Sequence, residues 1–377
     1  MTQETKKLTI KQQLSSGLSA LLLTLSLCVC FGAVTGQGLF FVLICVLWCT
    51  IISVLSKRSI FAPHPLFIVP FFFVCFGGSF FGAIFAVSTG ACLCCLFGTS
   101  LEKIKIPDFV FSGAALGICL GATILLTNSY FGIGAFGSTP LEMLKSYRSL
   151  GFHPNFMGLL TGTITLFTMI TYPFKFRKLR RIIPAPFITI LIPFILNLFL
   201  NPQKDYTTIN EALCLTPVTD FSVKEFISSY SASQISTVIK GAVVFFLVFT
   251  AANQKSHQKA LPLIPTFPVA SYHTDGFSPL SGCVMALISV GAILLFPATF
   301  ARLPVHCAGS MLIVLAWQSL PFKKIAEVFK TKERRLVSII GFLVCALSFV
   351  FADAFTAVLI SAAASLIFRK EAKANEE

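Results

Sequence analysis

Long uninterrupted apolar runs recur along the whole chain and limit its fold more than any other feature. A helix needs about 17–25 such residues to cross the hydrocarbon core of a bilayer. Only 12% of the 377 residues are charged, whereas soluble domains have about one quarter. The runs are too long and too continuous for the alternating strands of a membrane barrel. The sequence therefore predicts an all-α polytopic membrane protein.

About twelve transmembrane helices follow from these runs. The candidate spans are 15–36, 38–56, 64–79, 81–100, 108–127, 155–174, 183–200, 236–252, 280–299, 304–320, 336–350 and 353–368. The third span is short and begins beside Pro63 and Pro65, so we expect a half-helix that starts inside the membrane. The last two spans share almost no connector, which predicts a tight helical hairpin.

The net charge of +14 is distributed in a way that indicates topology. Most of the 29 Lys and Arg residues fall in alternate connections, counted from residues 1–13. The exceptions are Lys145, Arg148, Lys204, Lys224, Lys240 and Arg302. This is the positive-inside pattern, so we expect a multi-pass protein of the cell (inner) membrane with both termini cytoplasmic. The same placement argues against a nucleic-acid partner.

Metal, cofactor and catalytic signatures are missing from the pattern. Nearly all of the 13 cysteines lie in or beside apolar runs, where a thiol behaves as a small hydrophobe. No second pair stands at zinc-site spacing. H-E-x-x-H, G-x-S-x-G and paired intramembrane aspartates are also lacking. We therefore predict no metal, no cofactor and no enzymatic activity.

The cytoplasmic segment PFKKIAEVFKTKERR, 321–335, alternates apolar and basic residues at helical spacing. Such a segment can lie on the inner leaflet, attracted by anionic lipid. A basic linker without a further role has the same pattern.

Five stretches resemble the sulfate permease (SulP) family of anion transporters, which includes the prestin-like carriers. The clearest is LRRIIPAPFITILIPFIL, 179–196, which is similar to that family's basic turn and I-P-x-P-L-I helix start. The others are DFVFSGAALGICLGATIL (108–125), GFHPNFMGLLTGTITLF (151–167), AGSMLIVLAWQSL (308–320) and FADAFTAVLISAAASLIFRK (351–370). They occur in the family's order along the chain.

The resemblance implies two inverted seven-helix repeats, with a core domain that moves against a gate domain. The transmembrane transporter domain would span 15–368, between a cytoplasmic N-terminus, 1–14, and a cytoplasmic tail, 369–377. Its parts would be a first repeat (15–200), an extracellular connection (201–235) and a second repeat (236–368). The family's soluble regulatory STAS domain is expected to be lacking, and a homodimer is implied.

In this family the third and tenth helices are broken, and their N-termini bind an anion through backbone N–H groups. The resemblance places this site at Pro63, His64, Pro65, Leu66, Ala270 and Ser271. His64 can donate to the anion or can be a turn residue between two prolines. His273 and Asp275 can form a pH-sensitive coupling pair, or an exposed loop pair.

The second half of this predicted site departs from the family. Asp275 stands where the family has arginine, which reverses the sign of the interaction with an anion. Residues 253–267 are too short and too polar to form the family's ninth helix. We therefore expect the ninth and tenth helix region to be shortened.

Acidic residues are nearly absent from the predicted spans. Asp108 and Asp353 are the exceptions, and Asp353 can simply cap the last helix. A cation carrier needs intramembrane carboxylates, whereas an anion site can be built from helix N-termini, so this pattern favours an anion substrate. His306 lies near the outer mouth and has no partner visible in the sequence.

The sequence therefore predicts a secondary transporter of small inorganic or organic anions, such as sulfate or bicarbonate, embedded in the lipid bilayer. The alternative is a degenerate, non-transporting member of the family that acts as a membrane scaffold or partner protein. The shortened region and Asp275 motivate this second hypothesis.

Overall fold

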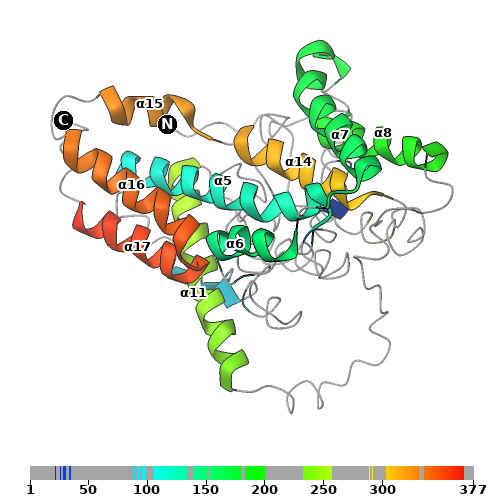
Figure 1. Cartoon of the computed structure of the whole chain (residues 1–377). Coiled ribbons are helices and arrows are strands. Elements are labelled where there is room, and N and C mark those ends of the chain that lie inside the picture. The colour runs from blue at the N-terminus through cyan, green and yellow to red at the C-terminus, as the bar shows by residue number, and fades with distance from the viewer. Residues whose placement is uncertain are drawn as a thin grey trace.

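The computed structural model describes residues 106–133, 137, 139–151, 153–179, 183–200, 232–256, 303–318, 320–330 and 335–368. Scattered residues between 22 and 34, between 86 and 97, and at 288 and 291 are also described. The regular elements of these residues are all helices (Figure 1), which confirms the all-α prediction.

The helices agree with the predicted spans wherever both can be compared. They are α5 (Asp108–Phe131), α6 (Pro140–Leu150), α7 (Phe156–Lys175), α8 (Ala185–Leu200), α11 (Ala232–Ser256), α14 (Val305–Gln318), α15 (Phe322–Lys330), α16 (Arg335–Phe351) and α17 (Ala354–Ile367). The hairpin prediction is confirmed by α16 and α17, and α15 is the helix predicted within 321–335. Helix α6 was not predicted, because it lies between the candidate spans 108–127 and 155–174. The predicted spans that lie wholly or largely outside the described residues are 15–36, 38–56, 64–79, 81–100 and 280–299.

Local sequence sets the ends of these helices. Helix α5 starts after Pro107 and ends at Gly132, whose φ of 68° is the left-handed conformation that favours glycine. Helix α7 starts at Asn155, whose side chain accepts a hydrogen bond from the Gly158 N–H at 2.9 Å. Helix α6 is capped in the same way by Thr139, which accepts from the Glu142 N–H at 3.2 Å.

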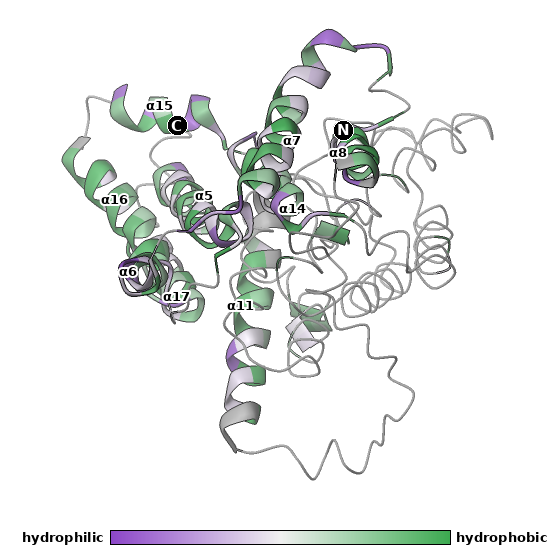
Figure 2. Cartoon of the chain, turned by 45° about the vertical axis from the view of Figure 1, so that its right-hand side comes forward, coloured by the Kyte–Doolittle hydropathy of each residue, from purple (hydrophilic) through white to green (hydrophobic). Residues whose placement is uncertain are grey.

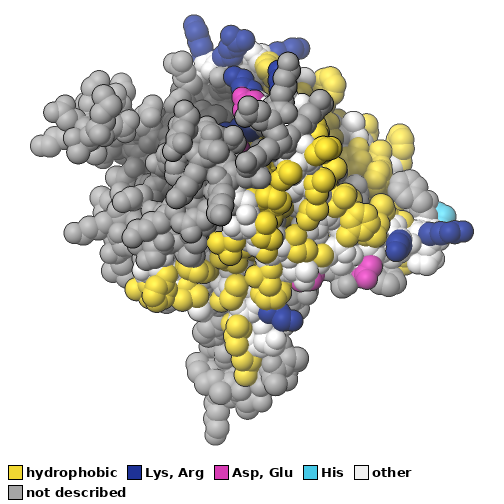
Figure 3. All heavy atoms as spheres, turned by 90° about the vertical axis from the view of Figure 1, so that its left-hand side faces the viewer, with side chains coloured by type: hydrophobic (Ala, Val, Ile, Leu, Met, Phe, Trp, Pro, Cys, Tyr) yellow, Lys and Arg dark blue, Asp and Glu magenta, His cyan; other side chains and the backbone are white. Residues whose placement is uncertain are grey.

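Two described helices, α5 and α7, are long and apolar enough to cross a membrane, and a third span results if α14 and α15 are taken together despite the 45° bend between them. Figure 2 shows mainly hydrophobic colouring along α16. Figure 3 looks at the side that carries α15, α16 and α17, and hydrophobic side chains are spread over it. On α16 an exposed stripe is formed by Leu336, Ile340, Leu343, Leu347 and Phe351. Such a face suits contact with lipid.

The contacts between the described helices repeat in the two halves of the chain. Helix α5 crosses α14, and each of the two also packs on a helix from the other half of the chain: α5 on α16, and α14 on α7 (Figure 1). Helix α8 then packs on α7, as α17 packs on α16. Three helices of the first half (α5, α7, α8) thus have the same contacts as three of the second (α14, α16, α17).

Glycines permit the closest of these approaches. A Cβ atom added at Gly113 would lie 2.9 Å from the Phe342 Cα, and one at Gly117 would lie 2.9 Å from the Ala346 Cα. Both pairs advance by four residues, so α5 and α16 run in the same direction with their backbones in contact. Small residues at such crossings are typical of membrane helices.

Candidate functional site

The predicted anion-site residues lie outside the part of the chain that the structure describes. They are Pro63, His64, Pro65, Leu66, Ala270 and Ser271. The coupling residues His273 and Asp275 lie outside it as well. Their assignment to a binding site remains a prediction from the sequence.

A buried polar centre among the described residues surrounds His306, where α5 ends and where α7 and α14 begin. The His306 side chain is only 1% exposed. A Cβ atom at Gly132 would lie 2.8 Å from its Nε2 atom, and Gly158 on α7 leaves the space that the ring occupies. The structure therefore places the His306 ring inside a junction of three helices, and its position near the outer mouth stays a prediction from the sequence.

The ring fits between the helices because α7 has glycines one turn apart. Gly158 lies against His306, and Gly162 lies against Ser310, where a Cβ would be 3.0 Å from the Ser310 Oγ. These pairs also advance by four residues on each helix. The spacing of the glycines in GFHPNFMGLLTG indicates that another helix can pack closely against this one. It does not indicate which helix that is.

The hydroxyl groups around this junction are engaged within their own helices. Thr161 donates to the Gly158 carbonyl at 2.8 Å, and Thr165 donates to the Thr161 carbonyl at 2.9 Å. On α14, Ser310 donates to the His306 carbonyl at 2.8 Å. An anion needs donors that point toward it, and these three donors are already used. The three hydroxyl groups therefore contribute to the structure of their own helices at this junction.

Helices α5 and α14 are also joined by polar contacts near the other end of α14. The Trp317 Nε1–H donates to the Thr123 Oγ1 at 2.9 Å, and Thr123 donates to the Cys119 carbonyl at 2.7 Å. The Cys119 thiol donates to the Ala316 carbonyl at 3.1 Å. These bonds tie the two halves of the chain at the crossing. Sequence analysis singled out the A-W pair of 308–320 but could not supply its partner.

The two carboxylates of the described spanning helices lie at helix starts. Asp353 accepts hydrogen bonds from the N–H groups of Phe355 and Thr356, at 3.1 and 3.3 Å, and from the Thr356 hydroxyl at 2.6 Å. This confirms Asp353 as the N-cap of α17. Asp108, at the start of α5, forms an ion pair with Lys324 of α15 at 3.3 Å. The pair holds α15 beside the end of α5 that is predicted to be cytoplasmic.

Among the described cysteines, four are buried: Cys30, Cys119, Cys307 and Cys345. Packing, as expected from their apolar surroundings, explains these positions. No group of three potential metal ligands occurs among the residues that the structure describes.

Comparisons with known proteins place the fold. No protein-family profile and no curated protein sequence matches the chain. Solved structures do match: SLC26A9, with a TM-score of 0.63 and 14% identity, is similar over 96% of this chain, which spans 66% of that protein's length. Murine SLC26A9, an anion transporter solved in the inward-facing state, has a TM-score of 0.59 and 14% identity over 96% of this chain and 68% of that one.

The transmembrane domain of BicA, a cyanobacterial bicarbonate transporter, is matched almost end to end. The similarity covers 95% of this chain and 97% of that domain, with a TM-score of 0.60 and 12% identity. The chain is therefore a polytopic membrane protein with the fold of these transmembrane domains, as the resemblance to the SulP family implied.

Proposed function

We propose that this protein is a secondary transporter of small anions across the cell (inner) membrane and a member of the SulP family. The similarity to the BicA transmembrane domain, which covers 95% of this chain and 97% of that domain, is the observation that carries the proposal. An anion carrier of this kind requires such a transmembrane scaffold, and sulfate, bicarbonate and similar anions are the substrate class that we propose.

The charges of the described helices support an anion as the substrate. In the helices α5, α7, α8, α11, α14, α16 and α17, carboxylates occur only at two helix starts, Asp108 and Asp353, and both are engaged there. A carrier of cations would need carboxylates within the bilayer. Helix N-termini can bind an anion without any charged side chain.

Within this proposal, the binding site lies at the starts of the third and tenth helices. Residues 63–66 supply the first half, and Ala270 and Ser271 supply the second. His273 and Asp275 act in pH sensing or coupling. The repeat boundaries, the cytoplasmic termini and a homodimeric assembly complete the proposed arrangement.

The alternative is a non-transporting scaffold, and Asp275 favours it because its charge opposes anion binding. Uptake of labelled sulfate and bicarbonate into proteoliposomes separates the two functions. We expect saturable uptake by the wild-type protein and its loss in His64→Ala. His153→Ala is the matched control, because His153 is an exposed histidine outside the proposed site.

No uptake of either anion by correctly reconstituted protein, under a gradient or a membrane potential, would contradict the transporter. Uptake that appears only in Asp275→Arg would favour the scaffold, because the family's site would then work only after repair. Equal uptake by His64→Ala and His153→Ala would show that the His64 side chain does not take part in anion binding.

A further inference from the structure

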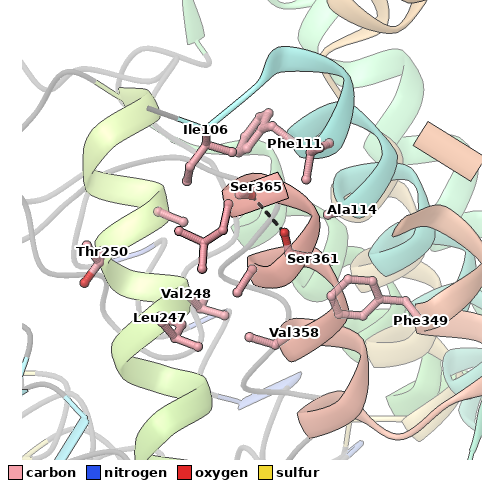
Figure 4. A pocket seen from close by; sticks show the side chains of 14 residues that line it. Ile106, Phe111, Ala114, Leu247, Val248, Thr250, Phe349, Val358, Ser361 and Ser365 are labelled. Atoms are coloured by element: carbon pink, nitrogen blue, oxygen red, sulfur yellow. Dashed lines mark hydrogen bonds between the residues drawn. The ribbon is translucent and has the colours of Figure 1, made fainter. Parts of the chain in front are cut away.

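A cavity of about 210 Å³ lies between α11 on one side and α5, α16 and α17 on the other. Figure 4 shows side chains from α11 and α17 facing the same space. Val110 and Phe111 contribute from α5, Leu247 and Val248 from α11, and Val358 from α17. None of these residues belongs to the His306 junction.

The hydroxyl groups in the cavity wall are satisfied within their own helices. Thr250 donates to the Phe246 carbonyl at 2.8 Å, Ser361 to the Ala357 carbonyl at 3.0 Å, and Ser365 to the Ser361 carbonyl at 2.8 Å (Figure 4). No charged side chain is among the described lining residues. The described part of the wall therefore offers no uncommitted hydroxyl donor for an anion, and it offers few of the polar partners that hold a buried water.

The size and the opening of the cavity further limit the classes of ligand that it can bind. An apolar cavity of about 150 Å³ accommodates benzene, whereas a helix about 10 Å wide needs far more room. The cavity is partly open, and Leu366 at its rim is 57% exposed. The helices around the cavity are apolar, and the exposed Leu366 side chain would face lipid hydrocarbon once α17 is in a bilayer.

We propose that this cavity binds one acyl chain of a membrane lipid. The described lining residues are apolar or have hydroxyl groups that are hydrogen-bonded within their own helices. An acyl chain would be stabilised there by burial of its apolar surface and by van der Waals contacts with these residues. The bound acyl chain would touch α11 and α17 at the same time. A lipid in the cavity would therefore link α11 to α5, α16 and α17.

The test uses full-length protein in proteoliposomes that contain a phosphatidylcholine with a diazirine on its acyl chain. After illumination, mass spectrometry should find lipid adducts on cavity residues of α17 and on the facing stretch 247–251. Ala362→Phe fills the cavity, and we expect these adducts to fall about tenfold, the effect of losing roughly two buried methylene contacts.

Ala363→Phe is the matched control, because Ala363 is the next residue of α17 and is exposed. It should leave the cavity adducts unchanged. Ala251→Leu fills the cavity from α11, so the test does not depend on the folding of one variant.

Absence of wild-type adducts at the cavity would overturn the proposal. So would adducts that survive both filling variants, or that fall equally in Ala363→Phe, since either result would indicate general labelling of the lipid-facing surface.

Discussion

Gly158 of α7 leaves the space that the imidazole of His306 occupies at the start of α14. The pair joins helices that lie about 150 residues apart in the sequence. The equivalent contact in the repeated helix packing is that of α5 with α16, where Gly113 and Gly117 lie against backbone atoms. Glycines thus permit both helix crossings. At the α7–α14 crossing they make room for a side chain, and at the α5–α16 crossing they let the backbones touch.

Gly158→Ala tests the first of these contacts. The new methyl group would overlap the His306 ring, and overpacking of this kind costs about 1–3 kcal/mol. Elsewhere in a helix, Gly→Ala gains up to about 1 kcal/mol. We expect a lower Tm in detergent, measured by thermal unfolding of the purified protein.

Gly291→Ala is the control for this change, because a Cβ atom at Gly291 meets nothing within 4 Å. The double variant Gly158→Ala/His306→Ala should recover much of the lost stability, since the obstructing ring is gone. Additive losses in the double variant would show that the two residues do not share the space.

Gly117→Ala tests the second contact and should be harder to rescue. Here the added methyl group would meet the backbone of Ala346 rather than a side chain. Helix α16 would have to move, so we expect a larger drop in Tm than for Gly158→Ala. A drop no larger than that of Gly158→Ala would indicate that the α5–α16 crossing adjusts easily.

We expect Tyr147 of α6 to lower the stability of the protein at alkaline pH. Burial raises the pKa of the Tyr147 hydroxyl above its ordinary value near 10, and a hydrogen bond with Thr127 partly lowers it. Because the folded-state pKa is the higher one, this stabilisation is complete below about pH 10 and is lost as the pH rises through the folded pKa.

The Tyr147 prediction is checked by measuring Tm against pH together with the absorbance titration of tyrosine. Tyr147→Phe should remove one late-titrating phenol and flatten the alkaline decline in Tm. Thr127→Val should shift that phenol to higher pH. An unchanged alkaline decline in Tyr147→Phe would assign it to other groups.

The sequence predicted the positions of single helices better than the contacts between helices. Pro107 and Asp353 mark helix starts through chemistry that is local, and the structure has helices beginning beside both. Helix α6 was missed although Thr139 and Glu142 have the spacing of a capping box, because charged residues made 140–150 resemble a connection.

Contacts between distant segments could not be predicted in this way. Nothing near Trp317 indicates that Thr123 accepts its hydrogen bond, and nothing near His306 indicates Gly158. These pairings depend on the crossing of whole helices. The family resemblance supplied the fold, but the residues that hold α5 against α14 became visible only in the structure.

Asp353 provides the test of whether an intramembrane carboxylate has a transport role. Its side chain caps α17 through Phe355 and Thr356, so Asp353→Ala should cost about 1 kcal/mol of stability. Asp353→Ser keeps a capping oxygen but removes the charge. If the role is structural, Asp353→Ser should retain both the Tm and the anion uptake of the wild type.

The two variants therefore separate capping from coupling. Loss of uptake in Asp353→Ser at wild-type Tm would show that the charge itself takes part in transport, as in a proton-coupled carrier. Retained uptake in Asp353→Ser, with reduced Tm in Asp353→Ala, would show that transport does not require the Asp353 charge. Asp108, which pairs with Lys324, would then be the remaining carboxylate of the described spanning helices to test, and His273 and Asp275 are the residues to change after it.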